Sequence, residues 1–280
     1  MQWKLLIGLS GWGFCGATAT VLQSVFSTQP VFASCTNSQL LLSCTEQALS
    51  SNDSCCVENK SGLILLAQFW DIHAGYPDQW TIHGLWTDYC TNSTWPEFCD
   101  DSRAHSNITA ILQSRGKYEL LQTMNNVWPN SEGLVDSLWF HEWNKHGTCM
   151  TTLEPGCTSS DKLELDSYQG IIDYFSSAVD LYSRFPVFQA LARRNILPGR
   201  IYQTTLVASA IEEELGILPN LQCDTNGTLS ELWLYFYVKG PIKYLEFYPT
   251  QPDSTSSCNV SLYYPKKYPS NPYPVTNVIP

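Results

Sequence analysis

The segment HEWNKHGTC, residues 141–149, places two histidines, a glutamate and a lysine within six positions. Its first letters resemble the zinc signature H-E-x-x-H, in which the two imidazoles lie four residues apart on one helix face. His141 and His146 are five residues apart, so on a regular helix their directions differ by about 140°. This spacing argues against a zinc peptidase, and no third-ligand motif is present. We therefore expect neither a metal nor another cofactor at this site.

The spacing instead suits chemistry on a phosphodiester. On a helix, His141 lies above Lys145 and Glu142 lies above His146, so the two rows adjoin and can converge on one phosphate. In this arrangement Glu142 is expected to orient His146. The segment TIHGLW supplies a further histidine, His83. Cleavage by an internal hydroxyl needs a base, an acid and fixed positive charge, and histidine can act as acid or base near mild pH.

TIHGLW, followed some 55 residues later by HEWNKHGTC, resembles the two active-site segments of the ribonuclease T2 family. The resemblance extends to the N-terminus, the cysteine placement, the segment LAQFW and the Trp-Pro pair before the second motif, over roughly residues 34–260. The adjacent pair Cys55-Cys56 and the ten-cysteine count are most similar to the secreted fungal branch of the family.

The resemblance implies a catalytic role for each matching residue. His146 corresponds to the general base that takes the ribose 2′-OH proton, and His83 to the general acid that protonates the leaving 5′-oxygen. His141 corresponds to a phosphate-binding residue, whereas Glu142 and Lys145 stabilise the transition state. The implied product is a 2′,3′-cyclic phosphate, which is then hydrolysed slowly to a 3′-phosphate.

The resemblance also implies two base-binding sites. Trp86 and Asp88 match members of the first site, where Trp86 would stack on a base, and Gln68 matches a member of the second. Two positions depart from the family pattern: Thr87 replaces the usual proline, and Leu138 lies where an aromatic residue is commoner. Leu138 weakens the expectation of an aromatic wall at the second base site, so the base preference is open while the catalytic set is complete.

The N-terminus predicts export. Residues 1–33 contain a short uncharged apolar run and end in small or apolar residues, as a secretory signal does, with or without a short pro-segment. The run is short for the alternative, an uncleaved membrane anchor. Removal of this segment takes away Cys15 and leaves ten cysteines, an even number that predicts five disulfides in an exported chain. Six N-x-S/T sequons suggest glycosylation, at Asn52, Asn59, Asn92, Asn107, Asn226 and Asn259.

Cysteine count alone does not fix the disulfide connectivity. The family pairing implies Cys35–Cys56, Cys44–Cys90, Cys55–Cys157, Cys99–Cys149 and Cys223–Cys258.

The hydrophobic pattern predicts a mixed fold. Strands are expected over residues 61–70, 81–86, 229–238 and 243–248, and helices over residues 102–113, 118–124, 136–149, 164–185 and 204–216, with a short helix after Pro186. Gly84 is expected to break its strand into a turn, and Gly147 to end its helix. Because no strict βαβα rhythm occurs, we expect an α+β fold with a central antiparallel sheet flanked by helices. The expected organisation is one disulfide-rich domain, residues 34–262, and a Pro/Tyr-rich tail, residues 263–280.

The chain has 280 residues, 44% of them hydrophobic, and a net charge of −11. Such a charge disfavours tight non-specific nucleic-acid binding, but an acidic compartment neutralises carboxylates while a phosphodiester stays anionic. We therefore predict a secreted, monomeric, metal-independent endoribonuclease that acts on single-stranded RNA with low base specificity, not on DNA and not at a membrane. It is expected outside the cell or, alternatively, in a vacuole or lysosome-like compartment. A second hypothesis is a catalytically silent glycoprotein of the same fold used for recognition or toxicity.

Overall fold

A computed structural model of the chain describes residues 35–158 and 168–268, which belong to one compact unit. Three predicted features lie wholly or partly outside these ranges. They are the secretory signal over residues 1–33, the start of the helix over 164–185, and residues 269–280 of the tail.

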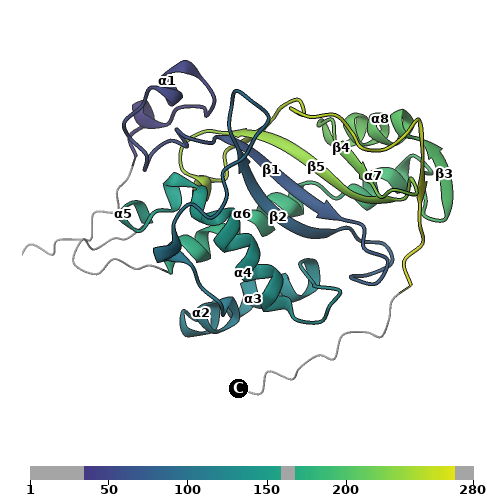
Figure 1. The fold of residues 1–280 in the computed structure, drawn as a ribbon, viewed down its shortest axis with the longest axis horizontal. Helices are drawn as coiled ribbons and strands as arrows, with labels where there is room; N and C mark the ends of the chain where they lie inside the picture. Colours follow the sequence, from purple (N-terminus) through teal and green to yellow (C-terminus); the bar gives the residue numbers. More distant parts are fainter. Residues whose placement is uncertain (1–34, 159–167, 269–280) are drawn as a thin grey trace, which may run out of the picture. The chain divides into compact units, whose positions relative to one another are not determined.

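An antiparallel five-stranded sheet forms the centre of the fold (Figure 1). The strand order is β2-β1-β5-β4, and β6 pairs with β5. The strands are β1 Leu63–Phe69, β2 Thr81–Asp88, β4 Asn220–Cys223, β5 Leu229–Val238 and β6 Phe247–Pro249. The apolar run of β1 lies between β2 and β5, because a strand covered on both faces needs apolar residues at successive positions. This sheet confirms the predicted α+β class.

Alternation along β5 divides the sheet into two faces. Leu232 and Leu234 are fully buried in the main core, which they share with the helices. Trp233 and Tyr235 point to the other face, where Tyr235 lies directly across from Leu65 of β1. The second face carries only a small apolar cluster, and it forms the floor of a cleft.

Eight α-helices and five short 3-10 helices occur among the described residues. The α-helices are α1 Glu46–Leu49, α2 Ile108–Ser114, α3 Tyr118–Val127, α4 Val135–Lys145, α5 Pro155–Thr158, α6 Gln169–Arg184, α7 Val187–Arg193 and α8 Thr204–Leu215. The 3-10 helices are η1 Asn37–Gln39, η2 Asp101–Arg103, η3 Gly147–Cys149, η4 Thr151–Leu153 and η5 Ile242–Tyr244. The long helix α6 turns an apolar face with Ile171 and Phe175 into the main core.

The structure corrects several predicted boundaries. The helix expected over 102–113 is divided, because Asn107 accepts a hydrogen bond from Ala110 N–H and so begins α2. Helix α4 ends at Lys145 rather than at Gly147. Strand β2 continues past Gly84 to Asp88, so this glycine does not break it. Residues 243–248 contain the end of η5 and the first part of β6, which pairs with β5.

The described body extends beyond the predicted domain end at residue 262. Strand β7, Ser261–Tyr264, pairs with β3, Arg200–Gln203, in a separate two-stranded sheet. Beyond it, the buried Lys267 Nζ donates hydrogen bonds to the carbonyls of Ala74 (2.8 Å) and Gln79 (2.7 Å). The first part of the expected tail therefore packs into the domain as far as residue 268.

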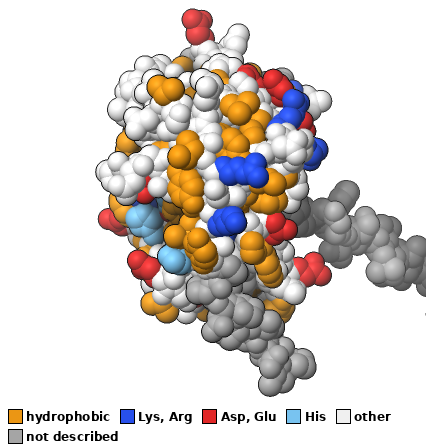
Figure 2. Space-filling view, turned by 90° about the vertical axis from the view of Figure 1, so that its right-hand side faces the viewer, with side chains coloured by type: hydrophobic (Ala, Val, Ile, Leu, Met, Phe, Trp, Pro, Cys, Tyr) orange, Lys and Arg blue, Asp and Glu red, His pale blue; other side chains and the backbone are white. Residues whose placement is uncertain are grey.

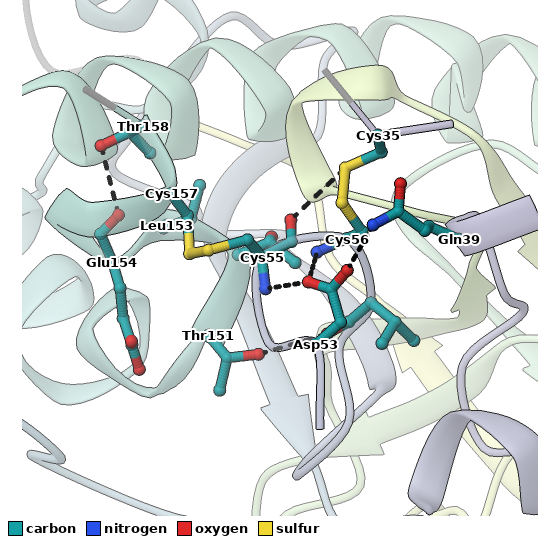
Figure 3. The surroundings of a disulfide bond; sticks show 12 residues. Cys35, Gln39, Asp53, Cys55, Cys56, Thr151, Leu153, Glu154, Cys157 and Thr158 are labelled. Carbon is teal, nitrogen blue, oxygen red and sulfur yellow. Dashed lines mark hydrogen bonds between the residues drawn. A yellow bond between two sulfur atoms is a disulfide. The ribbon is translucent and has the colours of Figure 1, made fainter. Parts of the chain in front are cut away.

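Five disulfides staple the fold in the pairing that the resemblance implied: Cys35–Cys56, Cys44–Cys90, Cys55–Cys157, Cys99–Cys149 and Cys223–Cys258. Figure 3 shows how the adjacent Cys55 and Cys56 serve two different partners. Asp53 fixes this turn, because its carboxylate accepts hydrogen bonds from both cysteine N–H groups, at 3.1 and 3.0 Å. The N-terminal segment is thereby tied to α5.

Apolar side chains remain on one face of the surface. Figure 2 shows hydrophobic side chains gathered on the side of the molecule that carries α8 and β3, and Ile201, Leu206 and Tyr263 are among the exposed ones there. In the two described ranges, no helix combines the length and the apolar character needed to span a bilayer.

Candidate active site

His83 lies at a bulge in strand β2. Its neighbours Ile82 and Gly84 pair with consecutive residues of β1, so His83 is the extra residue without a partner in the ladder. A bulge turns a side chain out of the regular alternation. The ring stacks on Phe69 of β1, with centroids 3.8 Å apart and planes 18° apart. From behind, Trp128 Nε1 donates a 2.7 Å hydrogen bond to the His83 carbonyl and supports this bulge.

Two carboxylates flank the His83 ring. Nδ1 lies 2.6 Å from Oε1 of Glu231 on β5, and Nε2 lies 3.5 Å from Oε1 of Glu142 on α4. When the ring is protonated both nitrogens are donors, so this environment suits a protonated histidine. Glu231 was not among the predicted site residues.

Glu142 is completely buried beside His83. Its Oε2 accepts a 2.7 Å hydrogen bond from Trp86 Nε1. Burial raises the pKa of Glu142 to about 7, although the positive charge of His83 and the Trp86 hydrogen bond lower it. The expected pairing of Glu142 with His146 is wrong: α4 ends at Lys145, and the side chain of Glu142 turns to His83 and Trp86 instead.

His146 caps the C-terminus of α4 and is only 5% exposed. Its ring stacks on Trp86 at a centroid distance of 5.1 Å, and its buried Nδ1 has no hydrogen-bond partner among the described residues. Burial, followed by the charges of Lys145 and the other two histidines of the site, lowers the pKa of His146 to about 2. The ring is therefore neutral and able to accept a proton.

His141 and Lys145 bring cationic groups to the rim of the site. Lys145 Nζ forms a 3.2 Å ion pair with Glu97, and the edge of the His141 ring faces Phe98. Burial lowers the pKa of His141, as does the charge of Lys145. The rim segment is fixed to α4 because Phe98 N–H donates to the Lys145 carbonyl at 3.0 Å.

Two glycines in the motifs provide space rather than turns. A Cβ on Gly84 would overlap the Glu142 carboxylate and the Trp86 indole, and one on Gly147 would overlap the Trp143 ring. Neither glycine has a positive φ angle. The glycine of TIHGLW thus permits the close approach of β2 and α4 on which the site depends.

One cleft of about 460 Å³ collects the predicted residues. Its lining includes the five expected catalytic side chains, His83, His141, Glu142, Lys145 and His146, together with Trp86 and Asp88. Among residues 35–158 and 168–268, no group of three or more His, Cys, Asp or Glu side chains is arranged to hold a metal ion.

The base-site predictions have mixed outcomes. Asp88 lies in the cleft wall and is 7% exposed, and burial together with the charge of Asp253 raises its pKa to about 7. Trp86 lines the cleft, but His146 covers one of its faces and its N–H is engaged by Glu142. Gln68 does not line this cleft: its side chain is fully buried on the core face, with Nε2 3.5 Å from the Phe185 carbonyl. Its place in a second base site stays a prediction.

Several cleft residues escaped the motif analysis. Trp95 lies exposed at the rim, and Asp253 faces Asp88 from the segment after β6. No local pattern marks either residue. Glu231 had a signal, because it is the only charged residue in the otherwise apolar strand LSELWLYFYV.

Of the six sequon asparagines, five are exposed: Asn52, Asn92, Asn107, Asn226 and Asn259. Asn59 is half-buried, and its Nδ2 donates a 2.8 Å hydrogen bond to the Ser51 carbonyl.

Known proteins match both the sequence and the fold. The profile of the Ribonuclease T2 family matches residues 44–244. Ribonuclease T2 of Aspergillus oryzae is 40% identical over 222 residues, which are 77% of this chain and 78% of that protein. Ribonuclease Trv of Hypocrea rufa is 42% identical over 224 residues, or 77% and 92% of the two chains. The crystal structure of Actibind, described as a T2 ribonuclease, superposes with a TM-score of 0.76 at 37% identity, over 84% of this chain and 98% of that one.

The matches agree with the disulfide-rich α+β fold, and they define the class: the chain belongs to the Ribonuclease T2 family. It is an endoribonuclease of that type, and its substrate is RNA.

Proposed function

We propose that the enzyme cleaves single-stranded RNA by transphosphorylation, with His146 as general base and His83 as general acid. His146 takes the proton of the ribose 2′-OH, whose oxygen attacks the adjacent phosphorus. The P–O5′ bond breaks, and His83 gives its proton to the leaving 5′-oxygen. The resulting 2′,3′-cyclic phosphate is then opened slowly by water to a 3′-phosphate, with the two roles exchanged.

The observation that carries this proposal is the contrast between two histidines in one cleft. His146 is buried among cationic groups and holds no proton, whereas both ring nitrogens of His83 face carboxylates. A buried neutral ring suits a base, and a ring that contacts carboxylates through both nitrogens suits a proton donor. The positive charges of Lys145 and His141 then stabilise the pentacoordinate phosphorane, and Glu142 helps to hold His83.

Asp88 and Asp253 lie close together in the lining of the cleft. We infer that bases bind there through their amino groups, beside Trp86 and the exposed ring of Trp95, which offers a stacking surface. Stacking tolerates every base, and this supports low base specificity.

The setting of the enzyme is part of the proposal. Five disulfides and five exposed sequon asparagines favour a glycosylated monomer that is secreted through the signal at residues 1–33. Delivery to a vacuole or lysosome-like compartment is the alternative destination.

Product analysis tests the mechanism. Wild-type enzyme is incubated with a single-stranded RNA oligonucleotide and with the same oligonucleotide carrying one 2′-deoxy nucleotide, each with and without EDTA. We expect 2′,3′-cyclic phosphate ends to accumulate before 3′-phosphates, no cut after the 2′-deoxy position, and equal rates with the chelator. Cleavage after the 2′-deoxy nucleotide, or loss of activity in EDTA, would contradict the proposal.

A further inference from the structure

The side chain of Glu231 needs an explanation that the catalytic set does not provide. It projects from strand β5 on the cleft side of the sheet and is 15% exposed. A carboxylate in such a position is costly unless it is paired. Its oxygen Oε1 lies 2.6 Å from Nδ1 of His83, the short distance typical of a charge-assisted hydrogen bond.

Three adjacent strands cooperate in this contact. Phe69 of the central strand β1 pairs with Glu231 of β5 on one side and with Thr81 of β2 on the other. The bulge at His83 lets its ring lie over Phe69 and reach across to Glu231. The stack fixes the plane of the ring, and the carboxylate fixes which nitrogen faces the sheet.

The contact also determines where the hydrogens of the ring lie. A carboxylate can only accept, so Nδ1 must be the donor to Glu231. Nε2 then faces Glu142 and the cleft, and it is the nitrogen whose proton can leave. In the serine-protease triad, an aspartate in the same position relative to histidine holds the correct tautomer, and its loss lowers kcat by about 10⁴-fold.

The other charged groups around His83 cannot replace this contact. Glu142 from α4 approaches Nε2 of His83, at 3.5 Å, and not Nδ1, and its Oε2 accepts the hydrogen bond from Trp86. Lys145 can only donate, and in the described part of the chain no hydrogen bond joins His141 or His146 to Nδ1 of His83. Glu231 is the partner at hydrogen-bond distance.

We propose that Glu231 is a positioning residue of the ribonuclease reaction, which holds His83 with Nδ1–H toward the sheet so that Nε2 delivers the proton to the leaving 5′-oxygen. This inference rests on the proposed function, because it assigns Glu231 to the acid of that mechanism. Glu231 itself does not touch the reacting atoms.

The test compares two substrates that differ in their need for an acid. One is a ribodinucleotide, whose 5′-alkoxide must be protonated as it leaves. The other is a ribonucleoside 3′-(4-nitrophenyl phosphate), whose phenolate leaves without a proton. The variants are Glu231→Gln, the charge-conserving Glu231→Asp, and Glu246→Gln as a matched control on an exposed carboxylate of the β5–β6 connection. Thermal unfolding of each variant shows whether it is folded.

Glu231→Gln is expected to lower kcat on the dinucleotide about 10- to 100-fold, the range typical of groups that orient a functional histidine. KM and the rate on the nitrophenyl ester should stay within about threefold, because catalysis by the base is untouched. Glu231→Asp should restore part of the lost rate, and Glu246→Gln should match wild type. When kcat on the dinucleotide is plotted against pH, the high-pH limb of the curve should move to lower pH in Glu231→Gln and in neither of the other two variants.

Equal loss on both substrates would overturn the proposal, since it would indicate general damage to the site, and so would an unchanged dinucleotide rate. Failure of the proposed function has a different signature. In that case His83→Phe would lower kcat by the same factor on both substrates, or wild-type enzyme would not cleave the dinucleotide. Either result would also remove the proposed role of Glu231.

Discussion

The two central histidines have the same side chain and opposite surroundings. His146 is buried against Trp86, and its Nδ1 has no hydrogen-bond partner in the described parts of the chain, whereas His83 contacts a carboxylate at Nδ1 and approaches another at Nε2. Their division of labour therefore follows from what each ring touches and not from the motif letters. Glu142 connects the two, because its carboxylate approaches His83 and binds the indole on which His146 stacks.

Asp88 gives a prediction about pH and stability. Its pKa rises from 3.8 to about 7 on folding, so between these values the folded protein binds a proton that the unfolded chain has lost. The free energy of unfolding therefore decreases as the pH rises from about 4 to 7, because the folded protein must give up this proton. Replacement Asp88→Asn removes the effect and should stabilise the protein at pH 7, relative to pH 4, by about 2–4 kcal/mol.

The measurement is denaturant unfolding of wild type and Asp88→Asn at a series of pH values. The difference between the two proteins isolates Asp88 from the other titrating groups. Asp101→Asn, on an exposed carboxylate, is the control and should show a constant offset. A pH-independent difference between wild type and Asp88→Asn would show that this carboxyl titrates normally in the folded protein.

At the level of elements, the site depends on the contact between β2 and the end of α4. Gly84 allows that contact because it has no side chain. We predict that Gly84→Ala destabilises the protein by about 1–3 kcal/mol, the usual cost of overpacking, and lowers kcat about 100-fold through displacement of Glu142. Denaturant unfolding and steady-state cleavage of RNA measure the two effects.

Gly156→Ala is the matched control for this substitution. An added Cβ there meets nothing within 4 Å, and the residue has no positive φ angle. It should leave activity unchanged and stability equal or slightly higher. Wild-type activity in Gly84→Ala would mean that the close approach of the two elements is not needed for catalysis.

The disulfide Cys99–Cys149 joins the rim segment to η3, directly after His146. This disulfide closes a loop between cysteines that are 50 residues apart in sequence. The double variant Cys99→Ala/Cys149→Ala should therefore lower the free energy of unfolding by about 4 kcal/mol. Because the rim holds Glu97 against Lys145, kcat/KM should also fall, about 10- to 100-fold. The disulfide Cys35–Cys56 links cysteines that are 21 residues apart in sequence. Its removal should lower the free energy of unfolding by about 3 kcal/mol and leave kcat/KM unchanged. Equal activities of the two double variants would contradict this division.

The site residues that lie within short motifs could be predicted from the sequence. Those that join the site only through tertiary packing could not. Five catalytic candidates come from two short segments, and all of them reach one cleft. Glu231 lies 148 residues from His83 in the chain, so no local pattern could join them. Gln68 does not reach this cleft for a simpler reason: it alternates with the cleft-facing positions of β1 and therefore points into the core.

The same distinction holds for the elements. Periodicity predicted the long apolar strands and α6, whose buried faces are continuous. It placed the end of α4 too late, because Gly147 makes room for Trp143 and does not adopt a left-handed cap. It also assigned the second half of β7 to a tail, since a short edge strand in which only Leu262 and Tyr264 are buried carries little hydrophobic signal.

At the scale of the whole molecule, the charge distribution explains how a chain of net charge −11 acts on a polyanion. Lys145 and three histidines line the same cleft as Asp88 and Asp253. Falling pH neutralises the carboxylates and leaves the phosphodiester anionic. Electrostatic attraction therefore acts mainly on the phosphate that reacts in the cleft, and the negatively charged remainder of the protein does not retain the RNA product.

The central claim is that His83 and His146 act on the same phosphate as acid and base. The most direct test is the pH profile of cyclic phosphate release from a ribodinucleotide by wild type, His83→Phe and His146→Phe. We expect the wild-type rate to follow a bell-shaped pH profile centred in the acid range, and each variant to release cyclic phosphate about 10²–10⁴-fold more slowly. The high-pH limb of the profile should disappear in His83→Phe, and the low-pH limb should disappear in His146→Phe. Near wild-type release by either variant, with its bell intact, would contradict the account.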